Sequence, residues 1–97
     1  MERTIEVQHP FAEPRRVDEA KYRAVRDALL RVIPTDRRGI PHRTLTPAVR
    51  RYLSPRDFPP ATIGHWVTTV LLDLMARGIV EEVGGEGPHR VRRIERS

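Results

Sequence analysis

The chain has 97 residues, of which 38% are hydrophobic and 32% are charged, with a net charge of +5 and no cysteine. That length allows one domain with a modest core, and the lack of cysteine excludes a disulfide framework and thiolate chemistry. No apolar run approaches the ~20 residues that span a bilayer, and residues 1–6 lack the hydrophobic region of a signal peptide. We therefore expect a cytoplasmic protein with no membrane contact.

The positive charge is arginine-rich and unevenly distributed. All but one of the 18 basic residues are arginine, and residues 34–60 combine six arginines with two aspartates, a net charge of +4. The guanidinium group suits phosphate recognition, because its fork of N–H donors matches two phosphate oxygens. A GC-rich coding sequence would give the same bias, so the composition leaves both explanations open.

Residues 1–16 are predicted to form an N-terminal arm, and residues 17–97 are predicted to form a folded domain. The arm contains Pro10 and Pro14 and shows no clear period. It also carries apolar residues, which favour an arm that lies against the domain rather than in solvent: Ile5, Val7 and Phe11.

The first helix is predicted over residues 18–33. Asp18 is suited to the N-cap, and Glu19 in the first turn faces the positive end of the helix dipole. Pro34 ends the helix, because the residue before a proline resists the α conformation. The apolar positions recur at helical spacing: Tyr22, Val25, Leu29 and Val32.

The second helix is predicted over residues 47–54. Thr46 is expected at its N-cap and Pro47 at its first position, where the missing N–H has no intrahelical use. In the connector before this helix, Ile40 either fills the core or forms a short strand. The apolar stripe of the helix consists of Val49, Tyr52 and Leu53.

The third helix is predicted over residues 60–77 and is expected to end at Gly78, which suits the left-handed C′ position. Two strands follow, at residues 79–83 and 89–94, joined by a glycine-rich turn. Three helices and then a two-stranded β-wing are typical of a winged helix-turn-helix, an α+β fold that is mostly α. The apolar face of the third helix consists of Ile63, Trp66, Val67, Val70, Leu71 and Leu74.

The opposite face of this third helix changes character along its length. At about 100° per residue, its first half is small and polar, whereas its second half carries Leu72, with Met75 at the edge. An exposed leucine at that position needs a partner. We expect either the N-terminal arm or a second subunit to cover it, so Leu72 and Met75 are interface candidates.

Several segments together match the pattern of a known family: Val17–Val25, Leu29-Leu30, Ile33-Pro34, Phe58-Pro59, His65–Val67, Val70–Leu74, Ala76–Gly78 and Pro88–Arg90. Over about residues 9–94, the chain resembles a family of small uncharacterised bacterial winged-helix proteins defined by a domain of unknown function. The resemblance implies a winged-helix fold and no established activity. Glutamine often stands in that family at the position of Leu71, and glutamate at that of Met75, so the third helix is more apolar in this chain.

Double-stranded DNA is the expected partner, in a transcription-associated role. The third helix of such folds enters the major groove, yet here it offers no Arg, Lys, Asn or Gln, the side chains that read bases best. Its groove-facing candidates are Thr62, His65, Thr68 and Thr69. Phosphate-contact candidates are more numerous: Arg43, Arg50 and Arg51 around the second helix, and Arg90, Arg92 and Arg93 on the wing.

The alternative is a protein-interaction or dimerisation module that uses Leu72 and Met75 and recognises either a second copy of the chain or another protein. An enzyme is not expected. The histidines, at positions 9, 42, 65 and 89, are more than twenty residues apart, so no local metal motif exists. Asp73 lies two helical turns from His65, too far for a direct hydrogen bond. We assign no catalytic residue, cofactor or metal ligand.

Overall fold

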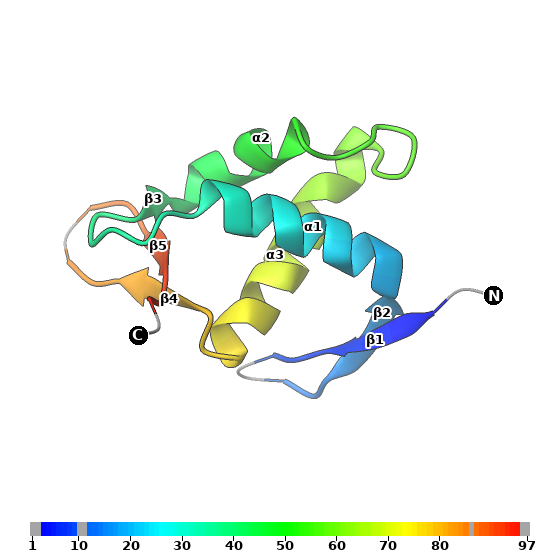
Figure 1. Ribbon diagram of the computed structural model, residues 1–97, viewed down its shortest axis with the longest axis horizontal. Coiled ribbons are helices and arrows are strands. Elements are labelled where there is room, and N and C mark those ends of the chain that lie inside the picture. The colour runs from blue at the N-terminus through cyan, green and yellow to red at the C-terminus, as the bar shows by residue number, and fades with distance from the viewer. Residues whose placement is uncertain (1–2, 10–11, 86, 96–97) are drawn as a thin grey trace.

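Three helices and two small antiparallel sheets make up the computed structural model, which describes residues 3–9, 12–85 and 87–95 (Figure 1). Pro10 and Phe11, assigned to the arm from sequence, lie outside the described residues. In chain order the elements are β1 (Thr4–Val7), β2 (Arg15–Asp18), α1 (Glu19–Val32), β3 (Ile40–Pro41), the 3₁₀ turn η1 (His42–Thr44), α2 (Leu45–Arg50), α3 (Pro60–Ala76), β4 (Val80–Val83) and β5 (Arg90–Arg93).

Helix α1 forms where its capping residue and apolar spacing predict it. The Asp18 carboxylate accepts a hydrogen bond from the backbone N–H of Lys21 at 2.8 Å, which confirms Asp18 as the N-cap. The buried side chains recur on one face of the helix and point into the core: Tyr22, Val25, Ala28 and Leu29. Both ends of this helix therefore lie within one residue of the predicted ends, because the cap and the proline that define them are local in sequence.

Helix α2 differs from the prediction at both ends. It begins at Leu45, directly after η1, and ends at Arg50, so Thr46 is inside the helix and makes no capping hydrogen bond. Pro47 is still tolerated, because the N–H groups of a first helical turn have no intrahelical acceptor. Leu45 and Val49 are both fully buried, and this pair, one helical turn apart, accounts for the earlier start.

Helix α3 ends in a Schellman motif. Gly78 has φ +74°, the N–H of Gly78 donates to Met75 O at 3.1 Å, and the N–H of Ile79 donates to Leu74 O at 2.9 Å. The predicted glycine stop is confirmed. The motif turns the chain directly from the helix into β4.

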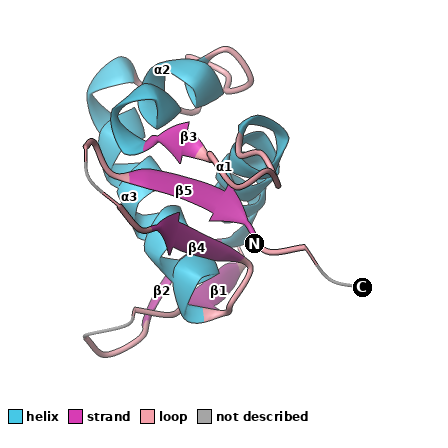
Figure 2. Cartoon of the chain, turned by 90° about the vertical axis from the view of Figure 1, so that its left-hand side faces the viewer, coloured by secondary structure: helices cyan, strands magenta, loops and turns pink. Residues whose placement is uncertain are grey.

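The C-terminal sheet contains three strands in the order β3-β5-β4, with β5 in the middle (Figure 2). The expectation of a two-stranded wing was therefore incomplete, because Ile40 pairs with Val91 and adds β3 to one edge. Gly39 precedes that strand with φ +63°, and a Cβ atom there would lie 2.5 Å from the carbonyl oxygen of Val91. Only glycine fits this close approach of two backbones.

The second sheet is a hairpin formed by the N-terminal segment. Strands β1 and β2 pair antiparallel with Ile5 opposite Val17, and the hairpin packs against α1 and α3 (Figure 1). Val7 is buried in the common core. Sequence patterning did not predict these strands, because each has four residues and only Val7 among them is buried.

Side chains from the hairpin, the three helices and the C-terminal sheet share one core. Phe58 is buried in the long turn before α3, and its ring meets the half-buried Trp66 edge to face, with centroids 6.0 Å apart. Fully buried members of the core include Val25, Leu29, Leu45, Val49, Val70, Leu74 and Val91.

Candidate nucleic-acid interface

The exposed face of α3 is smaller than its sequence suggested. Thr62, His65 and Thr68 are exposed, but the Thr62 hydroxyl donates to the carbonyl of Pro59 at 2.7 Å. Thr69 is only 9% exposed and faces the hairpin, so it is not available to a DNA groove. His65 and Thr68 are thus the polar side chains that remain for contact on this face.

Arg15 of β2 lies against α3 and was not among the residues singled out from sequence. Its Nη2 donates to the Thr69 hydroxyl at 2.8 Å and lies 3.4 Å from His65 Nε2. The neighbouring Arg16 bonds back to the side chain and carbonyl of Thr4 across the hairpin. Arg15 was not identified from the sequence, because residues 1–16 were predicted to form an arm without strands and nothing placed Arg15 next to α3.

Three of the predicted phosphate contacts, Arg43, Arg50 and Arg51, lie on η1 and α2 or directly after α2. All three are exposed, and none forms an ion pair with the part of the chain that the structure describes. The guanidinium of Arg51 lies 5.9 Å from the ring centre of Tyr52, and that of Arg31 lies 5.2 Å from the same ring. These cation–π contacts hold two positive charges together beside an exposed aromatic ring.

The arginines on β5 differ from those of η1 and α2, because two of them make structural contacts. Arg92 Nε donates to the Glu81 carboxylate at 2.8 Å, and Arg93 Nε donates to the carbonyl of Ile33 at 2.8 Å. The second bond satisfies a carbonyl at the C-terminal end of α1, where a cation is favoured. Arg90 is half-buried. The six arginines therefore do not form one uniform phosphate-binding set.

A shallow hollow of about 450 Å³ separates η1 from the turn between β4 and β5. It is lined by His42, Arg43, Glu82, Pro88 and His89, and the His42 N–H donates to the His89 carbonyl at 2.7 Å. This bond holds η1 against the turn between β4 and β5. Arg43 therefore lies next to that turn, together with the acidic Glu82.

Asp73 is the centre of a hub of polar contacts that begins in the interior. Its carboxylate, fully buried, accepts hydrogen bonds from the Tyr22 hydroxyl, from the Gln8 N–H at 2.6 Å and from Arg77 Nε at 2.9 Å. Arg77 Nη2 also donates to the carbonyl of Glu6 at 3.0 Å. The hub therefore joins β1, α1 and α3, segments that are far apart in the sequence.

Electrostatics at the hub follow from burial and pairing. Burial, followed by the hydrogen bond to Asp73, raises the pKa of Tyr22 from 10.0 to about 12. The hydrogen bond to Asp73 raises the pKa of Arg77. Both groups donate hydrogen bonds to the Asp73 carboxylate, so these contacts act as a structural tie between α1 and the end of α3.

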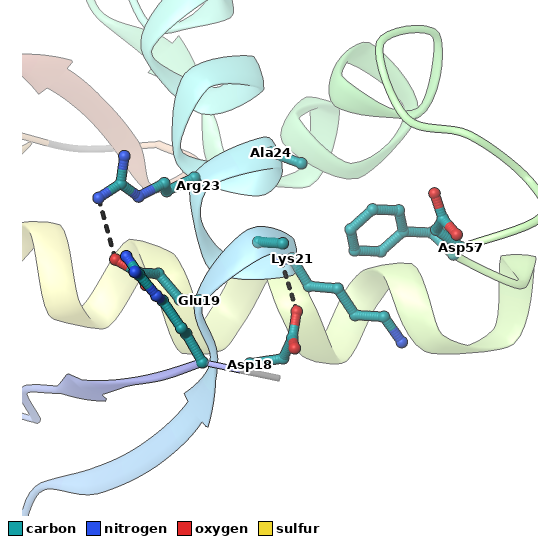
Figure 3. A pocket seen from close by; sticks show the side chains of 9 residues that line it. Asp18, Glu19, Lys21, Arg23, Ala24 and Asp57 are labelled. Carbon is teal, nitrogen blue, oxygen red and sulfur yellow. Dashed lines mark hydrogen bonds and ion pairs between the residues drawn. The ribbon is translucent and has the colours of Figure 1, made fainter. Parts of the chain in front are cut away.

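A second hollow, of about 630 Å³, lies at the start of α1 (Figure 3). Charges of both signs alternate around it: Glu19 pairs with Arg23 at 2.9 Å, and Lys21 and Asp57 line the same hollow. A hollow with charges of both signs does not favour the binding of a polyanion such as DNA. Within the described residues, no group of three or more His, Asp or Glu is arranged to hold a metal ion.

The fold and these surfaces define a small α+β domain with an arginine-rich middle segment. The chain belongs to a family of unknown function, DUF6958, which it matches over residues 4–91. No curated protein and no solved structure matches it. Among the described residues, no helix is both long enough and apolar enough to cross a bilayer.

Proposed function

We propose that this chain is a winged-helix domain that binds duplex DNA through the phosphate backbone, with little base reading by α3. The order of three helices followed by an antiparallel sheet supports the winged-helix assignment. The pairing of β3 with β5 supports it further, because many winged helices add a short early strand to the wing.

The observation that carries the proposal is the group of exposed arginines Arg43, Arg50 and Arg51. They lack ion-pair partners in the described part of the chain and belong to the segment with a net charge of +4. Unpaired guanidinium groups on one short stretch of η1 and α2 are suited to consecutive phosphates, since each neutralised phosphate releases a bound counterion. Binding of this kind is sequence-independent.

Base reading is assigned a minor role. His65 and Thr68 are the exposed polar side chains left on the groove-facing part of α3, and neither makes the bidentate contacts by which arginine or asparagine select a base. The hairpin also occupies one flank of the helix through Arg15. We therefore expect similar affinities for duplexes of unrelated sequence.

The interaction-module alternative has weaker support. Leu72 and Met75 are half-buried, and the hairpin lies along the same face of α3, with Val7 and Leu72 lining one hollow. The hairpin therefore already covers part of Leu72, and a second subunit is not the only means of burying it. Dimerisation through this face stays a prediction, to be tested by the oligomeric state in solution.

The test is fluorescence anisotropy of a labelled duplex at about 50 mM salt, where non-specific Kd values of about 10⁻⁴–10⁻⁶ M or tighter are measurable. We expect binding by the wild type and a loss of at least about tenfold when Arg43, Arg50 and Arg51 are all changed to glutamine. The matched control changes Arg3, Arg23 and Arg26 to glutamine and removes the same charge elsewhere. Equal losses in both variants would mean that net charge alone, not this surface, determines binding.

A further inference from the structure

The hairpin and α3 line a hollow that lies apart from Arg43, Arg50 and Arg51. Its volume is about 320 Å³, at the lower end of the range for small-molecule sites. Val7 and Ala12 line it from the hairpin side, and Thr68 and Leu72 line it from α3. Val7 is 3% exposed and Leu72 is half-buried, so part of the wall is apolar and anchored in the core.

Arg15 is fixed at the wall of this hollow by α3. Its two contacts, with the Thr69 hydroxyl at 2.8 Å and with His65 Nε2 at 3.4 Å, use a single guanidinium nitrogen, Nη2. The other guanidinium nitrogens make no hydrogen bond or ion pair with the described residues. Among the described residues, Arg15 is therefore held through Nη2 alone, and its Nε and Nη1 donors can serve a carboxylate ligand.

Glu13 lines the same hollow, two residues before Arg15. Glu13 and Arg15 carry opposite charges, yet they form no ion pair with each other. An anionic ligand alone would be repelled by Glu13, and a cationic ligand alone would be repelled by Arg15. A ligand that carries both charges satisfies the two groups at once.

We propose that this hollow binds a small zwitterion, an α-amino acid with an apolar side chain. Arg15 binds the carboxylate, with the Thr68 hydroxyl beside it, and Glu13 binds the ammonium group. The apolar side chain lies against Val7 and Leu72. The site is independent of the phosphate-binding surface proposed above, because it shares no residue with that surface.

The experiment is an NMR titration of the ¹⁵N-labelled full chain with L-leucine up to about 10 mM, above the Kd of a weak millimolar complex. Saturable shifts at residues that line the hollow are expected. N-acetyl-leucine, which lacks the ammonium group, and leucinamide, which lacks the carboxylate, are each expected to bind at least about tenfold more weakly. No saturable shift with leucine, or equal binding of all three compounds, would overturn the proposal.

Single variants test which residues bind the carboxylate and the ammonium group of the ligand. Arg15→Gln is expected to weaken leucine binding at least about tenfold, and Glu13→Gln is expected to remove the preference for leucine over N-acetyl-leucine. Glu13 is exposed, so its variant keeps the test informative even if Arg15→Gln loosens the hairpin. Arg56→Gln, an exposed arginine outside the hollow, is the matched control. If Arg56→Gln reduces binding as much as Arg15→Gln, the assignment of the carboxylate to Arg15 is wrong.

Discussion

Removal of the Asp73 carboxylate is the change expected to cost this fold the most stability. Asp73→Ala deprives three donors of their acceptor at once: the Tyr22 hydroxyl, the Gln8 N–H and the Arg77 guanidinium. Tyr22 is 3% exposed and cannot turn to water, so its unsatisfied hydroxyl costs about 1–3 kcal/mol. The half-buried Gln8 N–H loses a bond to a charged group, worth about 1.5–3 kcal/mol, part of which water replaces.

The contribution from Arg77 is smaller. Its side chain is 39% exposed, so its guanidinium can turn to solvent, and the loss is about 1 kcal/mol or less. Together these terms give a destabilisation of about 4 kcal/mol, within the range of about 3–5 kcal/mol for breaking a buried ion pair. That is a large part of the total stability of a small domain, about 5–15 kcal/mol.

The assay is urea unfolding followed by the fluorescence of Trp66, the single tryptophan. Asp27→Ala is the control, because Asp27 is exposed and its pair with Arg26 lies on the surface; a change within about 0.5 kcal/mol is expected. Hydrogen exchange at the Gln8 amide should accelerate in Asp73→Ala, because the hairpin loses its tie to α3. A destabilisation below about 1 kcal/mol would refute the view of Asp73 as the hub of the fold.

The remaining predictions concern the turns, the α3 face and Tyr22. Gly39→Ala should destabilise the fold by about 1–3 kcal/mol in thermal melts, because its Cβ would lie 2.5 Å from Val91 O. Gly78→Ala should destabilise the fold by about 1 kcal/mol, because the space around Gly78 is open and only its positive φ opposes alanine. Leu72→Glu should lower stability without changing the mass measured by light scattering if the hairpin covers it; conversion of a dimer to a monomer would favour the interaction module. Because the pKa of Tyr22 rises from 10.0 to about 12 on folding, its contribution is complete below pH 10 and is lost as pH rises toward 12. Tyr22→Phe should lack this alkaline loss in urea unfolding, and an identical pH profile would contradict the assignment.

Features set by neighbouring residues could be predicted from the sequence. The Asp18 cap and the Gly78 stop depend on contacts within a few residues, and both are found where expected. The start of α2 could not be located in the same way, because the burial of Leu45 overrides the Thr46-Pro47 capping signal. Tertiary packing decides such competitions, since capping preferences are worth only about 1 kcal/mol.

The candidate site was less predictable, because its contacts join distant segments. Arg93 reaches the Ile33 carbonyl, and Arg15 reaches Thr69, pairs separated by 60 and 54 residues. Neither pairing has a sequence period that would reveal it. Tyr22 and Asp73 are 51 residues apart, and for the same reason their hydrogen bond could not be predicted. Of the six arginines predicted from the sequence to contact phosphate, Arg43, Arg50 and Arg51 are exposed and have no ion pair with the described residues, as the composition indicated.

The salt dependence of duplex DNA affinity tests the central proposal most directly. If Arg43, Arg50 and Arg51 each contact a phosphate, a plot of log K against log salt concentration should have a slope of about −2.7 or steeper. The affinity should then fall about 40-fold or more between ~50 and ~200 mM salt. Changing all three to glutamine should make the slope shallower by about 2.7. No binding at ~50 mM salt, or a slope that the triple substitution leaves unchanged, would contradict DNA binding through this surface.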